Sequence, residues 1–116
     1  MPVRRIVAYA GGRELIASRD FYVEVLGMEV AMEEPVLNLQ SPDNPAAQLS
    51  VMSSDASAPV RPDVSIEVDD VDAAYAAAVR LGCEIVHPLT DEPWGVRRFF
   101  VEDPGGTIVN VLAHIG

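Results

Sequence analysis

Residues 18–30, SRDFYVEVLGMEV, decide the fold, because a stretch of the same kind, AAYAAAVRLGCEI, recurs at residues 73–85. Each stretch reads as a helix that ends in Leu-Gly and leads into a glutamate and a β-branched residue. Gly27 and Gly82 lie 55 residues apart, which is close to half of the 116-residue chain. Both suit the left-handed position just past a helix C-terminus. The sequence therefore predicts two similar halves.

Strand patterns flank both helices. An apolar run at residues 6–9 precedes the first helix, which we expect to begin between Glu14 and Ser18. The alternating stretch 64–68 precedes the second helix, at 71–81, which Asp69 or Asp70 can cap. Three strands are predicted after each helix, at residues 27–32, 36–40 and 48–52, and at 83–87, 97–102 and 107–113. Turns are predicted at 41–45 and 103–106. On the first helix, a stripe of Leu15, Phe21 and Val25 should face the core.

The predicted fold class is α+β. Two tandem βαβββ modules, residues 1–52 and 63–116, are joined by a linker at 53–62 that is rich in Ser, Ala and Pro. A module of this size buries little core alone, so we expect the two to form one curved mixed sheet with the helices outside and a concave trough. Whether they pair within one chain or swap between two chains stays open.

Composition excludes several classes of protein. No apolar run approaches the length of a membrane helix, and no signal peptide is evident, so we expect a cytoplasmic protein without a membrane partner. The net charge of −10 disfavours nucleic acid as a partner. The single cysteine, Cys83, excludes an internal disulfide and is expected to be a small buried residue.

Three motifs resemble those of the glyoxalase / bleomycin-resistance / dioxygenase superfamily, also known as the vicinal oxygen chelate superfamily. They are the run SRDFYVEVLGM at 18–28, the run EVDDVDAA at 67–74, and the hairpin PWGVRRFFVEDPGG at 93–106. The resemblance covers nearly the whole chain. It implies the paired βαβββ fold, which carries enzymes such as glyoxalase I, dioxygenases and epimerases as well as drug-binding resistance proteins.

The resemblance also implies four metal-ligand positions, usually occupied by His, Glu or Gln. In this sequence they fall on Val7, Gln48, Asp63 and Asn110. Valine cannot ligate a metal, and neutral amides are weak ligands for zinc or iron. His87, expected at the surface, and His114, near the chain end, do not restore a ligand set. We therefore expect no metal and no cofactor.

Strand alternation predicts the residues that line the trough. The candidates for ligand binding are Val7, Tyr9, Gln48, Ser50, Asp63, Ser65, Trp94, Arg97, Phe100 and Asn110. Trp94, in a loop at the expected mouth, could stack on a planar or cationic ligand, or could pack the loop onto the sheet. Of Arg97 and Arg98, and of Phe99 and Phe100, one each should face inward, and the sequence does not decide which.

These observations favour metal-independent binding or sequestration of an aromatic or cationic, drug-like small molecule by a homodimer. Two alternatives remain. One is a metal-dependent lyase, isomerase or dioxygenase with a remodelled site, in which Asp63 or Glu67 could serve as acid or base. The other is a non-binding partner module, whose trough would be filled by its own side chains.

Overall fold

A computed structural model describes residues 2–11, 14–33, 36–52, 55 and 57–115. The elements of the first half are β1 (Val3–Ala10), α1 (Leu15–Leu26), β2 (Glu29–Met32), β3 (Leu37–Ser41) and β4 (Asn44–Val51). Those of the second half are β5 (Val64–Val68), α2 (Val71–Arg80), β6 (Ile85–Glu92), β7 (Val96–Glu102) and β8 (Ile108–His114). No helix in the described part of the chain is long and apolar enough to cross a membrane.

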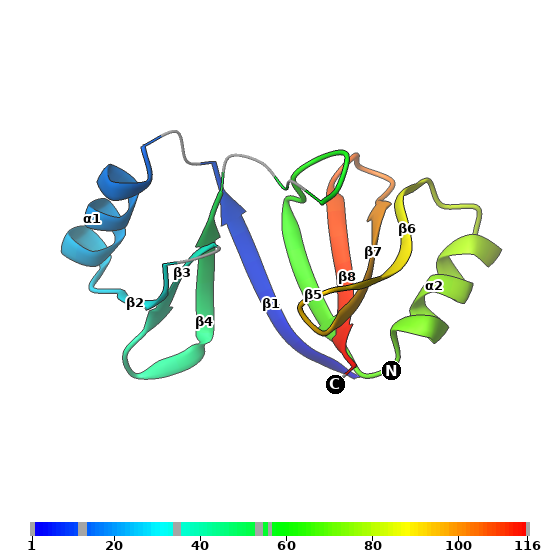
Figure 1. Cartoon of the computed structure of the whole chain (residues 1–116), viewed down its shortest axis with the longest axis horizontal. Coiled ribbons are helices and arrows are strands. Elements are labelled where there is room, and N and C mark those ends of the chain that lie inside the picture. The colour runs from blue at the N-terminus through cyan, green and yellow to red at the C-terminus, as the bar shows by residue number, and fades with distance from the viewer. Residues whose placement is uncertain (1, 12–13, 34–35, 53–54, 56, 116) are drawn as a thin grey trace.

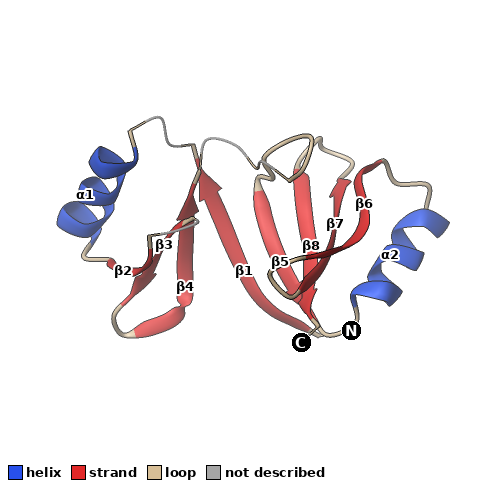
Figure 2. Cartoon of the chain, in the orientation of Figure 1, coloured by secondary structure: helices blue, strands red, loops and turns tan. Residues whose placement is uncertain are grey.

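The strands form one mixed sheet in the order β2-β3-β4-β1-β5-β8-β7-β6. At its centre β1 pairs antiparallel with β5, with Ile6 opposite Ile66. Next to this pair, β4 runs parallel to β1 and β8 runs parallel to β5. The two halves therefore pair within one chain, and the helices flank the strands at opposite ends of the molecule (Figures 1 and 2). The predicted α+β fold of two βαβββ units in a curved sheet is confirmed.

Packing against the helices defines the two faces of the sheet. In the second half, Val68, Phe99 and Ala113 form a buried cluster with α2, where the Tyr75 ring meets the Phe99 ring edge-to-face at 5.0 Å. In the first half, the buried cluster under α1 consists of Leu37, Leu39 and Val51. Since side chains alternate along a strand, the residues between these face the other way. We call the side away from the helices the inner face.

The side of α1 that packs on the core is not the one predicted. Leu15, Phe21 and Val25, predicted to face the core, are 46%, 52% and 62% exposed, so that prediction is wrong. Tyr22 and Val23 pack on the core instead. Apolar residues lie on nearly every side of α1, and its sequence therefore did not mark one face clearly.

Two strand boundaries also differ from prediction. The turn predicted at 41–45 is shorter, because Asn44 and Pro45 already belong to β4. The strand β6 continues past His87 and Pro88 as far as Glu92, which pairs with Val96 across a tight turn. Proline is tolerated there because β6 is the edge strand of the sheet.

The N-terminal cap of α2 can be tested by mutation. The Asp70 carboxylate accepts a hydrogen bond from the backbone N–H of Ala73 at 2.9 Å. Replacing Asp70 with alanine should lower the free energy of unfolding by about 1 kcal/mol, because an N-terminal N–H group of the helix loses its partner. Urea unfolding followed by circular dichroism measures the loss. Asp43→Ala, in an exposed turn, is the control, and equal midpoints for the two variants would contradict the assignment.

Candidate functional site

A row of small or neutral side chains crosses the middle of the inner face. The strand register places Val7 of β1 opposite Gln48 of β4 on one side and opposite Ser65 of β5 on the other. Ser65 in turn lies opposite Asn110 of β8, and Asn110 lies opposite Phe100 of β7. The register thus brings together five inner-face residues from five adjacent strands. We call them the central row.

Hydrogen bonds connect the central row to Tyr9. The Tyr9 hydroxyl lies 2.6 Å from the Ser65 Oγ, which also accepts a hydrogen bond from the Asn110 Nδ2 at 2.8 Å. Because the two hydroxyls share one bond, one of their protons is left without an acceptor in this chain of groups. The Asn110 Oδ1 has no partner among the described residues, although Asn110 is only 5% exposed. The row therefore offers one spare donor and one spare acceptor.

The central row does not fit a transition metal. It contains no His, Cys, Asp or Glu, and the Ser65 hydroxyl and the Asn110 amide already bond to each other. Within the described ranges, no three such metal-ligating side chains gather anywhere. These donors instead suit hydrogen bonding to an uncharged part of an organic molecule.

The predicted position of Asp63 in this row is wrong, because Ser65 takes it. Asp63 lies just before β5, is exposed, and accepts a hydrogen bond from the backbone N–H of Ile108 at 2.8 Å. The Asp63 carboxylate therefore has a structural role between β5 and β8.

Two other predicted site residues on the inner face already have partners. Gln48 lies in the row but bonds to Arg5 at 3.2 Å, and Ser50 is bonded to Asn38 at 3.1 Å.

The two arginines of β7 face opposite sides. Arg97, predicted for the inner face, lies on the outer face, where it bonds to Asp72 of α2 at 3.1 Å and to Asp91 at 2.6 Å. The hydrogen bond from Arg97 lowers the pKa of Asp91, and the same contact raises the pKa of Arg97. The prediction for Arg97 is therefore wrong, and Arg98 is the inward arginine. Phe100 was predicted to face inward, and this agrees with the packing of Phe99 on α2 on the outer face.

Arg98 is the centre of a buried charged cluster. Its side chain is 6% exposed, its Nε donates to Glu92 at 2.6 Å, and its Nη1 donates to Asp55 at 2.9 Å. Burial alone would raise the pKa of Asp55, but hydrogen bonds from Arg98 and Ser57 outweigh it and hold that pKa below its usual value. The guanidinium also lies 5.1 Å from the Trp94 ring centre and 4.9 Å from that of Phe100. Two carboxylates and two aromatic rings therefore surround this cation.

The sequence did not predict this cluster. His87, predicted at the surface, is buried, and its Nε2 lies 3.3 Å from Glu92. The adjacent arginines signalled that one would point inward, but nothing in the sequence links the linker residue Asp55 to β7. Trp94 lies in the turn between β6 and β7 and is 55% exposed, so one part of its indole is free for a ligand.

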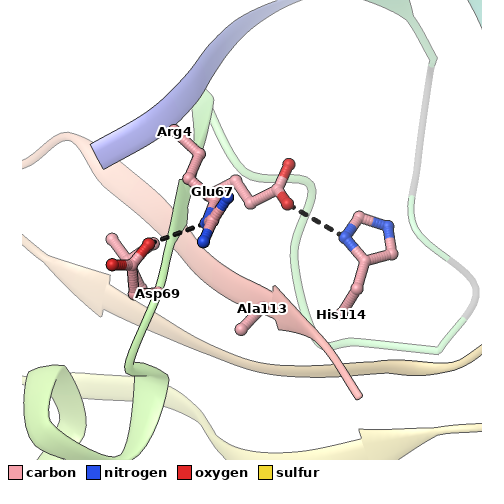
Figure 3. A pocket seen from close by; sticks show the side chains of 6 residues that line it. Arg4, Glu67, Asp69, Ala113 and His114 are labelled. Carbon is pink, nitrogen blue, oxygen red and sulfur yellow. Dashed lines mark hydrogen bonds and ion pairs between the residues drawn. The ribbon is translucent and has the colours of Figure 1, made fainter. Parts of the chain in front are cut away.

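A shallow hollow of about 250 Å³ lies at the lower edge of the sheet. Figure 3 shows its charged side chains turned toward one another: Arg4 contacts Asp69 at 2.7 Å, and His114 contacts Glu67 at 3.0 Å. Glu67 is further held by Arg5 at 3.1 Å. The polar side chains that line the hollow are thus paired with one another, Arg4 with Asp69 and His114 with Glu67.

Comparisons with known proteins agree with the fold. The family model of the Glyoxalase/Bleomycin resistance protein/Dioxygenase superfamily matches residues 10–111. None of the curated proteins compared with the chain matches it. A solved superfamily member from Vibrio splendidus 12B01 is similar, with a TM-score of 0.70 and 20% identity over 97% of this chain and 99% of that one.

Two epimerase structures are also similar. Methylmalonyl-CoA epimerase from Mycobacterium tuberculosis has a TM-score of 0.72 at 18% identity, over 98% of this chain and 88% of that one. A Streptomyces coelicolor methylmalonyl-CoA epimerase variant, in complex with 2-nitronate-propionyl-CoA, has a TM-score of 0.70 at 20% identity, over 99% and 100%. At these identities the similarity establishes the fold alone. Together with the family match, it shows that the chain belongs to the Glyoxalase/Bleomycin resistance protein/Dioxygenase superfamily.

Proposed function

We propose that this protein binds a small organic molecule on its inner face without a metal ion. The observation that carries the proposal is the hydrogen-bonded group Tyr9–Ser65–Asn110, in which the Asn110 Oδ1 is a buried acceptor without a partner among the described residues. A buried polar group without a partner costs roughly 1–3 kcal/mol, so a ligand that supplies the missing hydrogen bonds is stabilised there. Val7 and Phe100 supply the apolar surroundings.

The ligand that we propose is aromatic or cationic. An aromatic ring can stack on the exposed part of the Trp94 indole, and the protein's net charge of −10 attracts cations from solution. Trp94 is connected to the central row through Arg98 and Phe100, which contact each other at 4.9 Å. Binding or sequestration of such a molecule, in the cytoplasm, is the function that these features support best.

Metal analysis of the purified protein tests the metal-independent part of the proposal. We expect zinc, nickel, manganese and iron to remain well below one ion per chain, because the central row has neither an imidazole nor a carboxylate. Added metal should not raise the melting temperature. A stoichiometric ion that is removed by a chelator with loss of stability would instead favour a metal-dependent lyase, isomerase or dioxygenase.

Ligand titration tests the role of the central row. Benzamide and benzamidine, which share one ring and carry a neutral or a cationic group, are suitable probes for Trp94 fluorescence. Asn110→Ala should weaken the binding of benzamide about tenfold, because an acceptor in the row is removed. Asn44→Ala, at the exposed start of β4, is the matched control. Equal affinities in the two variants would show that the row does not bind the probe.

We also propose that the protein forms a homodimer through α1. None of the twelve residues of α1, all described, is buried, and Ile16, Phe21, Val25 and Leu26 are each more than half exposed. Several large exposed apolar side chains on one element are typical of surfaces that associate. A second copy of the chain would cover them in an isologous contact.

Replacing Phe21 with aspartate tests the dimer. The charge should abolish the apolar contact, so the variant should be monomeric at concentrations where the native protein is a dimer. Sedimentation velocity measures the two states. Glu24→Gln, also exposed on α1, is the control, and a native protein that is already monomeric would refute the proposal.

A further inference from the structure

The side of Arg98 that faces the linker is occupied by a carboxylate of the chain itself. Arg98 Nη1 donates to Asp55 Oδ2 at 2.9 Å, and Nη2 donates to the Ser57 hydroxyl at 2.9 Å and to Asp55 Oδ1 at 3.5 Å. The forked guanidinium is thus bound by two carboxylate oxygens and one hydroxyl. Arginine recognises carboxylates in this forked way in ligand sites as well as within proteins.

The residues around this contact resemble a binding site for an aromatic acid. The cation is nine-tenths buried, and the rings of Trp94 and Phe100 lie within 5.1 Å of its centre. Glu92 holds the Nε at 2.6 Å and is itself buried. Arg98 therefore stays in place if Asp55 leaves, with its two Nη groups free.

The contact to Arg98 is also the main attachment of the described part of this segment. Within residues 55 and 57–60, the other hydrogen bonds run inside the segment, from Ser57 and Ala58 to Asp55. Pro59 and Val60 are exposed. Separating Asp55 from Arg98 therefore breaks few other hydrogen bonds of residues 55 and 57–60.

We propose that Arg98 is a carboxylate-binding subsite and that Asp55 and Ser57 occupy it in place of a ligand. The ligand is then an aromatic carboxylate: its acid group replaces that of Asp55 on the Nη atoms, and its ring lies against the exposed part of the Trp94 indole. The exchange keeps the local charge constant, because one carboxylate leaves as another binds. This inference rests on the proposed function: it keeps the aromatic ligand and replaces the cationic alternative with an anionic one.

Asp55 lowers the apparent affinity for such a ligand, because the ligand binds only the fraction of molecules in which Arg98 is free. Removing the charge of Asp55 should increase that fraction. Asp55→Asn should bind benzoate about tenfold more tightly than the native protein, since charge-assisted hydrogen bonds are stronger than neutral ones. Benzamide, with the same ring and no charge, should show little change.

The experiment is titration of Trp94 fluorescence with benzoate, benzamide and benzamidine, with folding checked by circular dichroism. Asp91→Asn is the matched control, because it removes the same charge from an aspartate–arginine pair on the outer face. The double variant Asp55→Asn/Arg98→Lys keeps the positive charge and removes the forked donors. We expect it to lose the gain in benzoate affinity.

The outcomes separate this inference from the proposed function. If benzamide or benzamidine binds but Asp55→Asn binds benzoate no better than Asp91→Asn, the inference is wrong and the proposed function stands. If the gain for benzoate persists in the double variant, Arg98 is not the subsite. If none of the three probes binds any variant, both the inference and the proposed function fail.

Discussion

The structure depends on the pairing of β1 with β5. Each half of the chain has a short sheet with one of these strands at its edge, and an uncovered edge presents unpaired N–H and C=O groups. The antiparallel contact removes both edges at once and is extended by the hydrogen bond from Tyr9 N–H to the Asp63 carbonyl at 3.2 Å. The same register sets Val7 beside Ser65, so one backbone constraint fixes both the fold and the central row.

Most of the fold could be predicted because its signals are local and repeated. The Leu-Gly helix ends depend on glycine conformations that few other residues adopt, and Gly27 and Gly82 have φ values of 69° and 74°. The capping of α2 by Asp69 or Asp70 could also be predicted from the sequence. The rotation of α1 could not, because its apolar residues surround the helix and only the contacts of Tyr22 and Val23 identify the buried side.

The site was less predictable. The alternation of side chains along a strand shows that neighbouring residues face opposite sides of the sheet, but not which of them faces inward. Arg97 and Arg98 must face opposite ways, yet only the packing of Phe99 against Tyr75 of α2 shows which one faces inward. Asp63 was predicted at the position in the central row where the structure has Ser65. This is an error in the register between strands, and register depends on pairing between segments far apart in the sequence. The contact between Asp55 and Arg98 joins residues 43 positions apart, and no local signal encodes it.

The two helices cover their halves unequally. The helix α2 buries Val71 and packs on Phe99, whereas no residue of α1 is buried. Backbone segments open with free energies that follow the apolar contacts holding them. We therefore expect α1 to open at a lower free energy than α2, and its amide hydrogens to exchange with solvent sooner in the monomer. One continuous sheet thus carries a firmly packed helix at one end and a loosely packed helix at the other.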